Sequence, residues 1–346
     1  MYETRTRGQT HRIALADPAA VGRAAHLLRA GELVAFPTET VYGLGADASN
    51  ADAVGQIFAT KGRPAAHPVI VHVRDAAQVP HWARELPAGA TKLAKAFWPG
   101  PLTLILPRTS LASDAVTGGQ DNVGLRVPAH PVAQMLLAAF AALGGKGIAA
   151  PSANRFGHVS PTTAQHVADD LGDDVSLILD GGACAIGMES TIVAFAESEA
   201  MLLRPGAIDR DSLARVLGRS LVSASAAAPR ASGSLVSHYA PRTPLYVLTP
   251  LELPPAIRRR TADGDRVAVL ALTVARPAGF DGPWVGAARD SAGYARSLYA
   301  HLRTLDTSAA AAIFVEQVPD ATEWDAVRDR LGRAASGAAK SGTGSV

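Results

Sequence analysis

The sequence is poor in cysteine and in excess charge, and each shortage excludes a class of protein. Cys184 is the single cysteine among 346 residues, so an intramolecular disulfide and a zinc site built from several cysteines are both excluded. A reducing cytoplasm is therefore the expected compartment. The formal net charge is only +2, which gives no overall electrostatic attraction for nucleic acid but leaves room for a local basic patch.

The chain also lacks the apolar runs that membrane insertion and secretion require. The longest candidate, residues 132–143, is shorter than the roughly 20 residues of a membrane helix and contains Gln134. The N-terminal MYETRTRGQTHR has arginines but no apolar core after them, so it is not a secretory signal. Length and a hydrophobic content of 48% predict instead a globular protein of two domains with no membrane association.

Four common sequence motifs are missing as well. The chain has no GxxxxGK[ST], no GxGxxG after a predicted strand, no HExxH and no GxSxG. These absences argue against the usual phosphate-binding loops, zinc proteases and serine hydrolases. Any nucleotide site must therefore be built from other residues.

Polar and cationic side chains gather at the ends of predicted elements between residues 36 and 73. An apolar strand over residues 33–36 is followed by a carboxylate, hydroxyls and glycines. These residues are Thr38, Glu39, Thr40, Tyr42, Gly43 and Gly45. A helix predicted over residues 52–60 ends at Lys61 and Arg63, where Gly and Pro stop it. Two cations beside exposed backbone amides suit a polyphosphate, although they also complement a helix dipole.

Later strands end in the same way. Arg126 interrupts an apolar strand over residues 123–127, and a buried arginine needs an anionic partner, either a protein carboxylate or a ligand. Arg204 ends a strand over residues 201–204. Open α/β sheets bind ligands at the carboxyl ends of their strands. Together with Lys61 and Arg63, these arginines favour a nucleotide triphosphate site.

From about residue 217 the sequence becomes rich in Ala, Ser, Pro and Gly, which predicts a linker. Within it, residues 237–241 read SHYAP and place an aromatic pair where a linker needs none. The pair indicates either a linker that packs on another surface or a boundary turn anchored by a ring. Strands are then predicted to alternate with helices in a small second α/β domain. The strands are residues 245–248, 267–272 and 313–315, and the helices are residues 251–260, 292–305 and 324–331.

Seven segments in fixed order resemble one known family. They are FPTETVYGLGADA, KGRPAAHPVIVHV, WPGPLTLIL, VGLRVPAHP, APSAN, GMESTIV and LLRPGAI. The resemblance is to the YrdC-like threonylcarbamoyl-AMP synthases, and SHYAPRTP with the domain after it resembles their long form. It implies an α/β fold with a YrdC-like twisted open sheet with helices, plus a smaller Rossmann-like C-terminal α/β domain. The implied limits are 1–217 for the catalytic domain, 218–243 for a linker, 244–333 for the C-terminal domain and 334–346 for a disordered tail.

The family activity gives the expected function. Its members are nucleotidyltransferases that convert L-threonine, bicarbonate (or CO2) and ATP into threonylcarbamoyl-AMP and pyrophosphate, for N6-threonylcarbamoyladenosine in tRNA. The resemblance implies Mg2+ with the ATP, no dedicated metal site, and downstream tRNA threonylcarbamoyl-transfer proteins as partners. It also suggests that the HYAP segment closes over the active site.

The resemblance assigns roles residue by residue. The residues expected at threonine are Thr40, His72, Arg126, Ala150 and Ser190. The residues expected at ATP are Arg63, His67, Asn122, Ser152, Ser160, Arg204 and Tyr239. Lys61 and Arg63 are expected to be catalytic. The family usually has an asparagine where this chain has His67.

Two other functions share this fold. One is an RNA-binding or ribosome-maturation module with weak affinity for RNA, which the near-neutral net charge disfavours. The other is a carbamoyl-adenylate-forming relative from hydrogenase maturation, which carries Cys-rich zinc modules that a chain with one cysteine lacks. For the C-terminal domain, an allosteric or partner-binding unit and a simple anchor for the linker both remain open.

Overall fold

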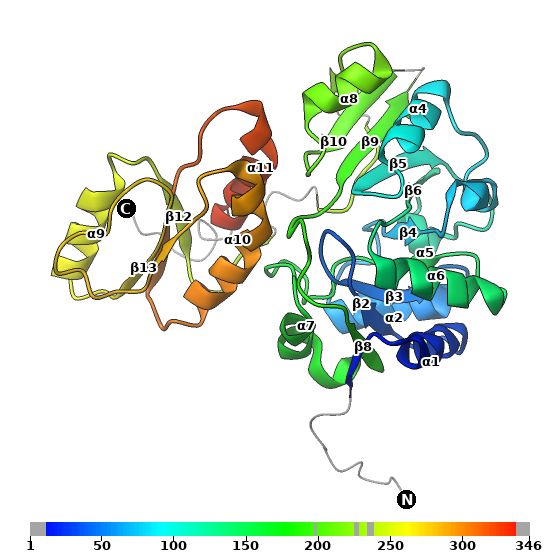
Figure 1. Ribbon diagram of the computed structural model, residues 1–346, viewed down its shortest axis with the longest axis horizontal. Helices are drawn as coiled ribbons and strands as arrows, with labels where there is room; N and C mark the ends of the chain where they lie inside the picture. The colour runs from blue at the N-terminus through cyan, green and yellow to red at the C-terminus, as the bar shows by residue number, and fades with distance from the viewer. Residues whose placement is uncertain (1–11, 197–198, 225–227, 234–238, 337–346) are drawn as a thin grey trace, which may run out of the picture.

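The computed structural model describes residues 12–196, 199–224, 228–233 and 239–336. Two β-sheets, each with its own helices, lie side by side (Figure 1). In the part of the chain that is described, no helix has the length and apolarity needed to cross a bilayer. The mixed α/β fold with one large and one small sheet confirms the predicted fold class.

The large sheet has eleven strands, parallel and antiparallel in mixture. Their order across the sheet is β1 (Ile13–Leu15), β8 (Leu177–Asp180), β2 (Val34–Phe36), β3 (Gly43–Asp47), β7 (Ile148–Ala149), β4 (Ile70–His72), β6 (Asn122–Arg126), β5 (Leu102–Pro107), β9 (Thr191–Ala196), β10 (Glu199–Arg204) and β11 (Val222–Ser223). Strands β4 and β6 are parallel neighbours, with His72 paired to Arg126. This pairing brings two predicted site residues together at the ends of adjacent strands.

Helices cover both faces of the large sheet. They are α1 (Pro18–Arg29), α2 (Ala51–Lys61), η1 (Ala76–Gln78), α3 (Val79–Trp82), α4 (Ala88–Phe97), α5 (Asp114–Thr117), α6 (Pro131–Ala142), α7 (Ala164–Leu171), η2 (Gly172–Asp174) and α8 (Arg210–Leu217). Alternate residues of β2 point to opposite faces. Val34 and Phe36 pack with α1 and α6, whereas Ala35 packs in the core that α2 and α4 cover.

Local sequence sets the ends of α2, which carries a predicted catalytic lysine. Asn50 caps the N-terminus by accepting from the backbone N–H groups of Asp52 and Ala53. Gly62 ends the helix in the left-handed conformation, with φ of 63°. The predicted helix over residues 52–60 is confirmed, and Lys61 and Arg63 flank its terminal glycine.

Four strands were not predicted from the sequence, the first of them the edge strand β1. Strand β3 was interpreted as a loop because Gly43 and Gly45 weaken strand propensity. A Cβ at Gly45 would lie 2.9 Å from both Phe36 and Ile148, so close packing inside the sheet requires glycine there. Strand β11 lies within the predicted linker and pairs in parallel with β10, and β14 (Trp284–Gly286) is a short edge strand.

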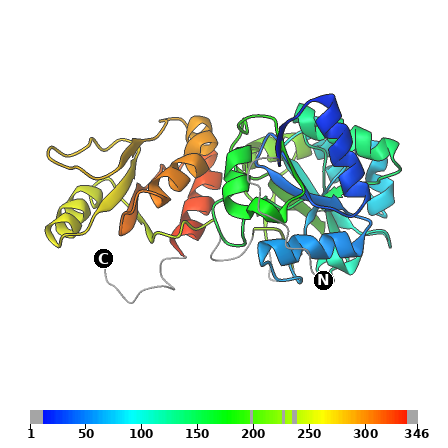
Figure 2. The same cartoon turned by 90° about the horizontal axis from the view of Figure 1, so that it is seen from below.

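The C-terminal domain is a parallel four-stranded sheet between helices. The strand order is β12 (Leu245–Leu248), β15 (Ala312–Glu316), β13 (Val267–Ala271) and β14. Helix α9 (Leu253–Ala262) packs on one face, whereas α10 (Ser291–Asp306) and α11 (Asp325–Ala335), which follows η3 (Thr322–Trp324), pack on the other. Both views place α10 and α11 against the large domain (Figures 1 and 2). Helix α11 extends to Ala335, and residues 337–346 of the predicted tail lie outside the described residues.

Glu316, the last residue of β15, holds the loop that follows β13. Its side chain accepts backbone hydrogen bonds from Leu272 (2.6 Å), Thr273 (2.8 Å) and Val274 (3.0 Å). Burial raises the pKa of Glu316, but these hydrogen bonds and the Thr273 hydroxyl outweigh burial and lower it. The carboxylate therefore stays charged at neutral pH and satisfies three backbone donors and one hydroxyl.

We predict that Glu316→Ala lowers the free energy of unfolding by about 2 kcal/mol, because three backbone donors lose their acceptor. Urea denaturation measures the change. The matched control is Glu323→Ala, at an exposed glutamate of the same domain, which should change stability by less than about 0.5 kcal/mol. Equal effects of the two substitutions would contradict this role for Glu316.

Candidate active site

A cavity in the large domain collects most of the predicted site residues. Its wall comes from the β2–β3 loop, the ends of β4, β6 and β10, the turn after β7, the loop before β9, and the linker. The lining residues are Thr38, Thr40, Val41, Gly43, Arg63, Ile70, His72, Arg126, Ala150, Pro151, Ser152, Glu189, Ser190, Arg204, Ser232, Gly233 and Tyr239. Hydroxyls and arginines therefore converge on one space from segments far apart in the sequence.

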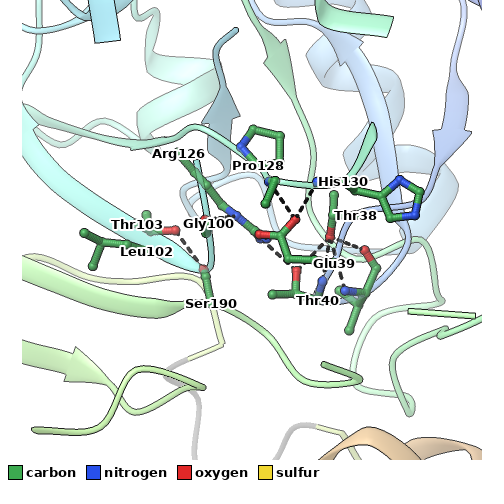
Figure 3. Close-up of polar contacts among 12 residues, drawn as sticks. Thr38, Glu39, Thr40, Gly100, Leu102, Thr103, Arg126, Pro128, His130 and Ser190 are labelled. Atoms are coloured by element: carbon green, nitrogen blue, oxygen red, sulfur yellow. Dashed lines mark hydrogen bonds and ion pairs between the residues drawn. The ribbon is translucent and has the colours of Figure 1, made fainter. Parts of the chain in front are cut away.

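Arg126 is held at the cavity by a buried carboxylate. Its Nη2 pairs with Glu39 Oε1 at 2.5 Å, and its Nη1 donates to Thr40 Oγ1 at 2.8 Å (Figure 3). The second oxygen of Glu39 accepts from the backbone N–H groups of Ala129 and His130. Burial raises the pKa of Glu39, but Arg126 outweighs burial and lowers it. The structure thus supplies the protein carboxylate that was one of the two predicted partners for Arg126.

His72 lies beside this pair and is 3% exposed. Its ring packs edge-on against Phe36, with 6.1 Å between ring centroids. Burial, together with the positive charge of Arg126, lowers the pKa of His72 to about 3. The imidazole is therefore neutral at physiological pH. Its Nδ1 has no hydrogen-bond partner among the described residues.

Arg204 and Ser190 form another part of the wall. Arg204 Nη2 donates to the backbone oxygen of Ser190 at 2.9 Å and to its Oγ at 3.1 Å. The Ser190 hydroxyl also lies 2.8 Å from Thr103 Oγ1. Carbonyl and hydroxyl oxygens orient the Arg204 guanidinium without neutralising its charge. That charge remains available for an anion.

The linker covers part of the cavity. The backbone oxygen of Ser232 accepts from Arg204 Nη1 at 2.8 Å, and its hydroxyl lies 3.4 Å from Arg63 Nη2. Tyr239 is 1% exposed, and a Cβ at Gly233 would collide with its hydroxyl. The aromatic of the predicted linker thus packs on the cavity. Residues 234–238, including His238, lie outside the described residues.

Four predicted site residues are not among those that line the cavity. Lys61, 3% exposed, donates from Nζ to the backbone oxygens of Ser152 (2.5 Å) and Asn154, and so braces the turn that carries Ser152. Burial and Arg63 lower the pKa of Lys61. The other three are His67, packed on Phe156, Asn122, at the start of β6, and Ser160, bonded to Glu189. Contacts of these four with a nucleotide stay predictions.

The site depends on residues to which the sequence assigned no role. Glu39 appeared there only as a carboxylate after a predicted strand, and Glu189 only within the segment GMESTIV. Carboxylates next to several buried cations are a usable signal, because buried charges need partners. Arg330 and Tyr299, which bond Glu189 from the C-terminal domain, carried no such signal.

Two family models match the chain almost end to end. One, described as "Telomere recombination", covers residues 26–206, and the other, "Threonylcarbamoyl-AMP synthase, C-terminal domain", covers residues 208–336. The threonylcarbamoyl-AMP synthase of Bacillus subtilis is 40% identical over 95% of this chain and 96% of that protein. The chain belongs to the threonylcarbamoyl-AMP synthase family.

Two further relatives extend this result. The threonylcarbamoyl-AMP synthase of Pyrococcus abyssi is 39% identical over 91% of this chain and 93% of its own length. A crystal structure of P. abyssi Sua5 complexed with L-threonine has a TM-score of 0.86 at 36% identity, covering 94% of this chain and 97% of that chain. The resemblance stated from the seven segments is confirmed, for both the large and the C-terminal domain.

We predict that His72 makes the protein less stable in acid. The unfolded chain binds a proton near pH 6.5 and the folded chain near pH 3, so stability falls as pH drops through this window. Between pH 7 and pH 5, the free energy of unfolding should fall by about 2 kcal/mol less in His72→Asn than in the unaltered protein. Urea denaturation at both pH values measures the difference. The control is the same exchange at an exposed position, His26→Asn, measured alongside. An unchanged loss in His72→Asn would contradict the assignment.

Proposed function

We propose that this protein makes threonylcarbamoyl-AMP and pyrophosphate from L-threonine, bicarbonate (or CO2) and ATP. The observation that supports it is one cavity in which Arg63, Arg126 and Arg204 face a set of hydroxyls. The reaction brings together an amino acid carboxylate and a triphosphate, and guanidinium groups recognise both. The family name and the threonine complex of the P. abyssi relative agree with this cavity.

In this proposal threonine binds at the wall made by Arg126. Its carboxylate meets the guanidinium, whose Nη1 and Nη2 are already oriented by Thr40 and Glu39. Neutral His72 offers its Nδ1 to a polar group of the amino acid. A neutral imidazole suits a site where the threonine amine must lose its proton before it reacts, because it has an unprotonated ring nitrogen that can accept a hydrogen bond from the amine, whereas an imidazolium has none.

ATP occupies the side of the cavity made by Arg63, Ser152 and Arg204. The described residues contain no group of three or more potential metal ligands, and both carboxylates at the cavity are already bonded to arginines. These residues do not fit a dedicated Mg2+ site. Magnesium therefore arrives as part of the substrate, held by the phosphate oxygens of MgATP.

The chemistry proceeds without a protein nucleophile. The unprotonated threonine amine adds to CO2 and releases a proton to solvent, which gives a carbamate. A carbamate oxygen then attacks the α-phosphorus of ATP in line and expels pyrophosphate. Arg63 and Arg204 stabilise the charge that develops on the phosphates. Lys61 acts by holding the turn of Ser152 in place. The linker limits access of water to the adenylate.

The product is an activated acyl group that requires an acceptor. We propose that downstream transfer proteins in the cytoplasm pass it to tRNA, as the family activity implies. RNA binding by this chain itself would be a separate function, and the pyrophosphate-release assay described next distinguishes the two.

We predict that pyrophosphate release from ATP requires threonine and bicarbonate together. Omitting either one should reduce release at least tenfold, because only the carbamate can attack the α-phosphorus. Mass spectrometry should find threonylcarbamoyl-AMP in the complete mixture. No release with any amino acid, combined with salt-sensitive RNA affinity, would contradict the proposal and favour an RNA-binding module.

A second prediction concerns recognition of threonine. Arg126→Lys should raise KM for threonine about tenfold to a hundredfold, because an ammonium cannot make the parallel hydrogen bonds of a guanidinium. Steady-state kinetics with varied threonine and saturating ATP measures the effect. Arg74→Lys is the control, since Arg74 forms an exposed ion pair with Asp75 away from the cavity lining. Equal KM values in both variants would exclude Arg126 as the carboxylate partner.

A further inference from the structure

Two side chains of the C-terminal domain reach a carboxylate in the catalytic cavity. Tyr299 on α10 donates from its hydroxyl to Glu189 Oε2 at 2.8 Å. Arg330 on α11 donates from Nε to the same oxygen, also at 2.8 Å. The Arg330 side chain is fully buried, and Glu189 is one of the cavity-lining residues. The two domains are therefore joined at the active site itself.

The carboxylate of Glu189 is fixed on both sides. Ser160 Oγ donates to Oε1 at 2.6 Å, while the C-terminal domain holds Oε2. Burial raises the pKa of Glu189, but Arg330, then Arg204 and the Ser160 hydrogen bond, lower it to about 2. Glu189 is thus a charged, oriented group next to Ser190 and Arg204.

Two buried cations act on this single carboxylate, but only one is hydrogen-bonded to it. Arg330 is bonded to Glu189, to Asp329 Oδ2 at 2.5 Å and to the backbone oxygen of Pro205 at 3.1 Å. Arg204 is bonded instead to oxygens of Ser190 and Ser232. This division gives Glu189 its ion pair and leaves the charge of Arg204 facing the cavity.

Removal of Arg330 would leave a buried carboxylate without its ion partner. Breaking a buried ion pair lowers the free energy of unfolding, so the remaining carboxylate is expected to bind a proton or to pair with another cation. The cation whose field already acts on Glu189 is Arg204. A pair between Glu189 and Arg204 would withdraw Arg204 from the phosphates of the substrate.

We propose that Arg330 is a positioning residue for the reaction: it occupies Glu189 and thereby keeps Arg204 available to the triphosphate. The inference rests on the proposed function, because it assigns Arg204 to ATP. It makes the C-terminal domain part of the nucleotide site rather than a separate unit.

The aromatic contacts of Arg330 also connect the C-terminal domain to the cavity. Its guanidinium carbon lies 5.0 Å from the centroid of the Tyr239 ring, and Tyr239 stacks on Tyr299 at 5.9 Å. A cation above a tyrosine face is a stabilising arrangement. The pair that holds Glu189 therefore also seats the linker tyrosine against the cavity.

The test compares two arginines that join the same two domains. Arg330→Met should raise KM for ATP about tenfold or more and change KM for threonine less than about twofold. The control is Arg303→Met, because Arg303 pairs with Asp170 across the domain boundary at 2.6 Å and lies outside the cavity lining. Arg303→Met should leave both KM values within about twofold. Equal changes in the two variants would reduce Arg330 to a docking contact and overturn the proposal.

A double variant separates positioning from loss of packing. If Glu189 pairs with Arg204 when Arg330 is absent, the double variant Arg330→Met with Glu189→Gln should have a lower KM for ATP than Arg330→Met alone. A double variant whose KM for ATP is no lower than that of Arg330→Met alone would overturn the proposal.

Thermal melting shows whether Arg330→Met is folded. If it is not folded, Tyr299→Phe is tested instead, because it removes one hydrogen bond to Glu189 without removing a charge. A rise in KM for ATP of about threefold supports the proposal, and no rise overturns it. The unaltered protein, assayed alongside, tests the proposed function independently.

Discussion

Burying several cations around one cavity is the constraint on which the rest of this structure depends. Arg63, Arg126 and Arg204 are each at most 6% exposed. A buried charge without partners is expensive enough to prevent folding or to lose its proton. The chain must therefore supply oxygen atoms to every guanidinium while leaving positive charge facing the cavity. These two requirements oppose each other, and the choice of partner resolves the conflict.

The structure uses two kinds of partner with different consequences. Carbonyl and hydroxyl oxygens satisfy hydrogen bonds without cancelling charge, and they serve Arg204 and Lys61. Carboxylates do cancel charge, and Glu39 holds Arg126 in this way. Glu39 is itself held by two backbone amides, so its orientation is set before any ligand arrives. The Arg204 side of the cavity therefore stays the more positive one, and the Arg126 side is the better defined in geometry.

The sequence predicted most of this arrangement but not the part that crosses between domains. Strand ends carrying Arg126 and Arg204 were recognisable because a charged residue in an apolar strand is conspicuous. Strand β3 was missed because glycines that permit close packing are indistinguishable in sequence from glycines that permit turns. Arg330 was missed for a different reason: on an amphipathic helix with several arginines, nothing local marks the one that is buried. Only the docking of two folded domains makes it so.

The position of Glu189 shows why the second domain is tied to the catalytic one. A carboxylate beside Arg204 weakens a phosphate site unless another cation takes it up. Supplying that cation from α11 couples three events: docking of the domains, seating of Tyr239 on the cavity, and release of Arg204 for the substrate. Because one side chain serves all three, a loss of domain contact at this point weakens the nucleotide site directly. The ion pair of Arg303 with Asp170, on the same interface, has no such link. On this proposal, the contact between the domains affects the nucleotide site through Arg330, and not through the size of the interface.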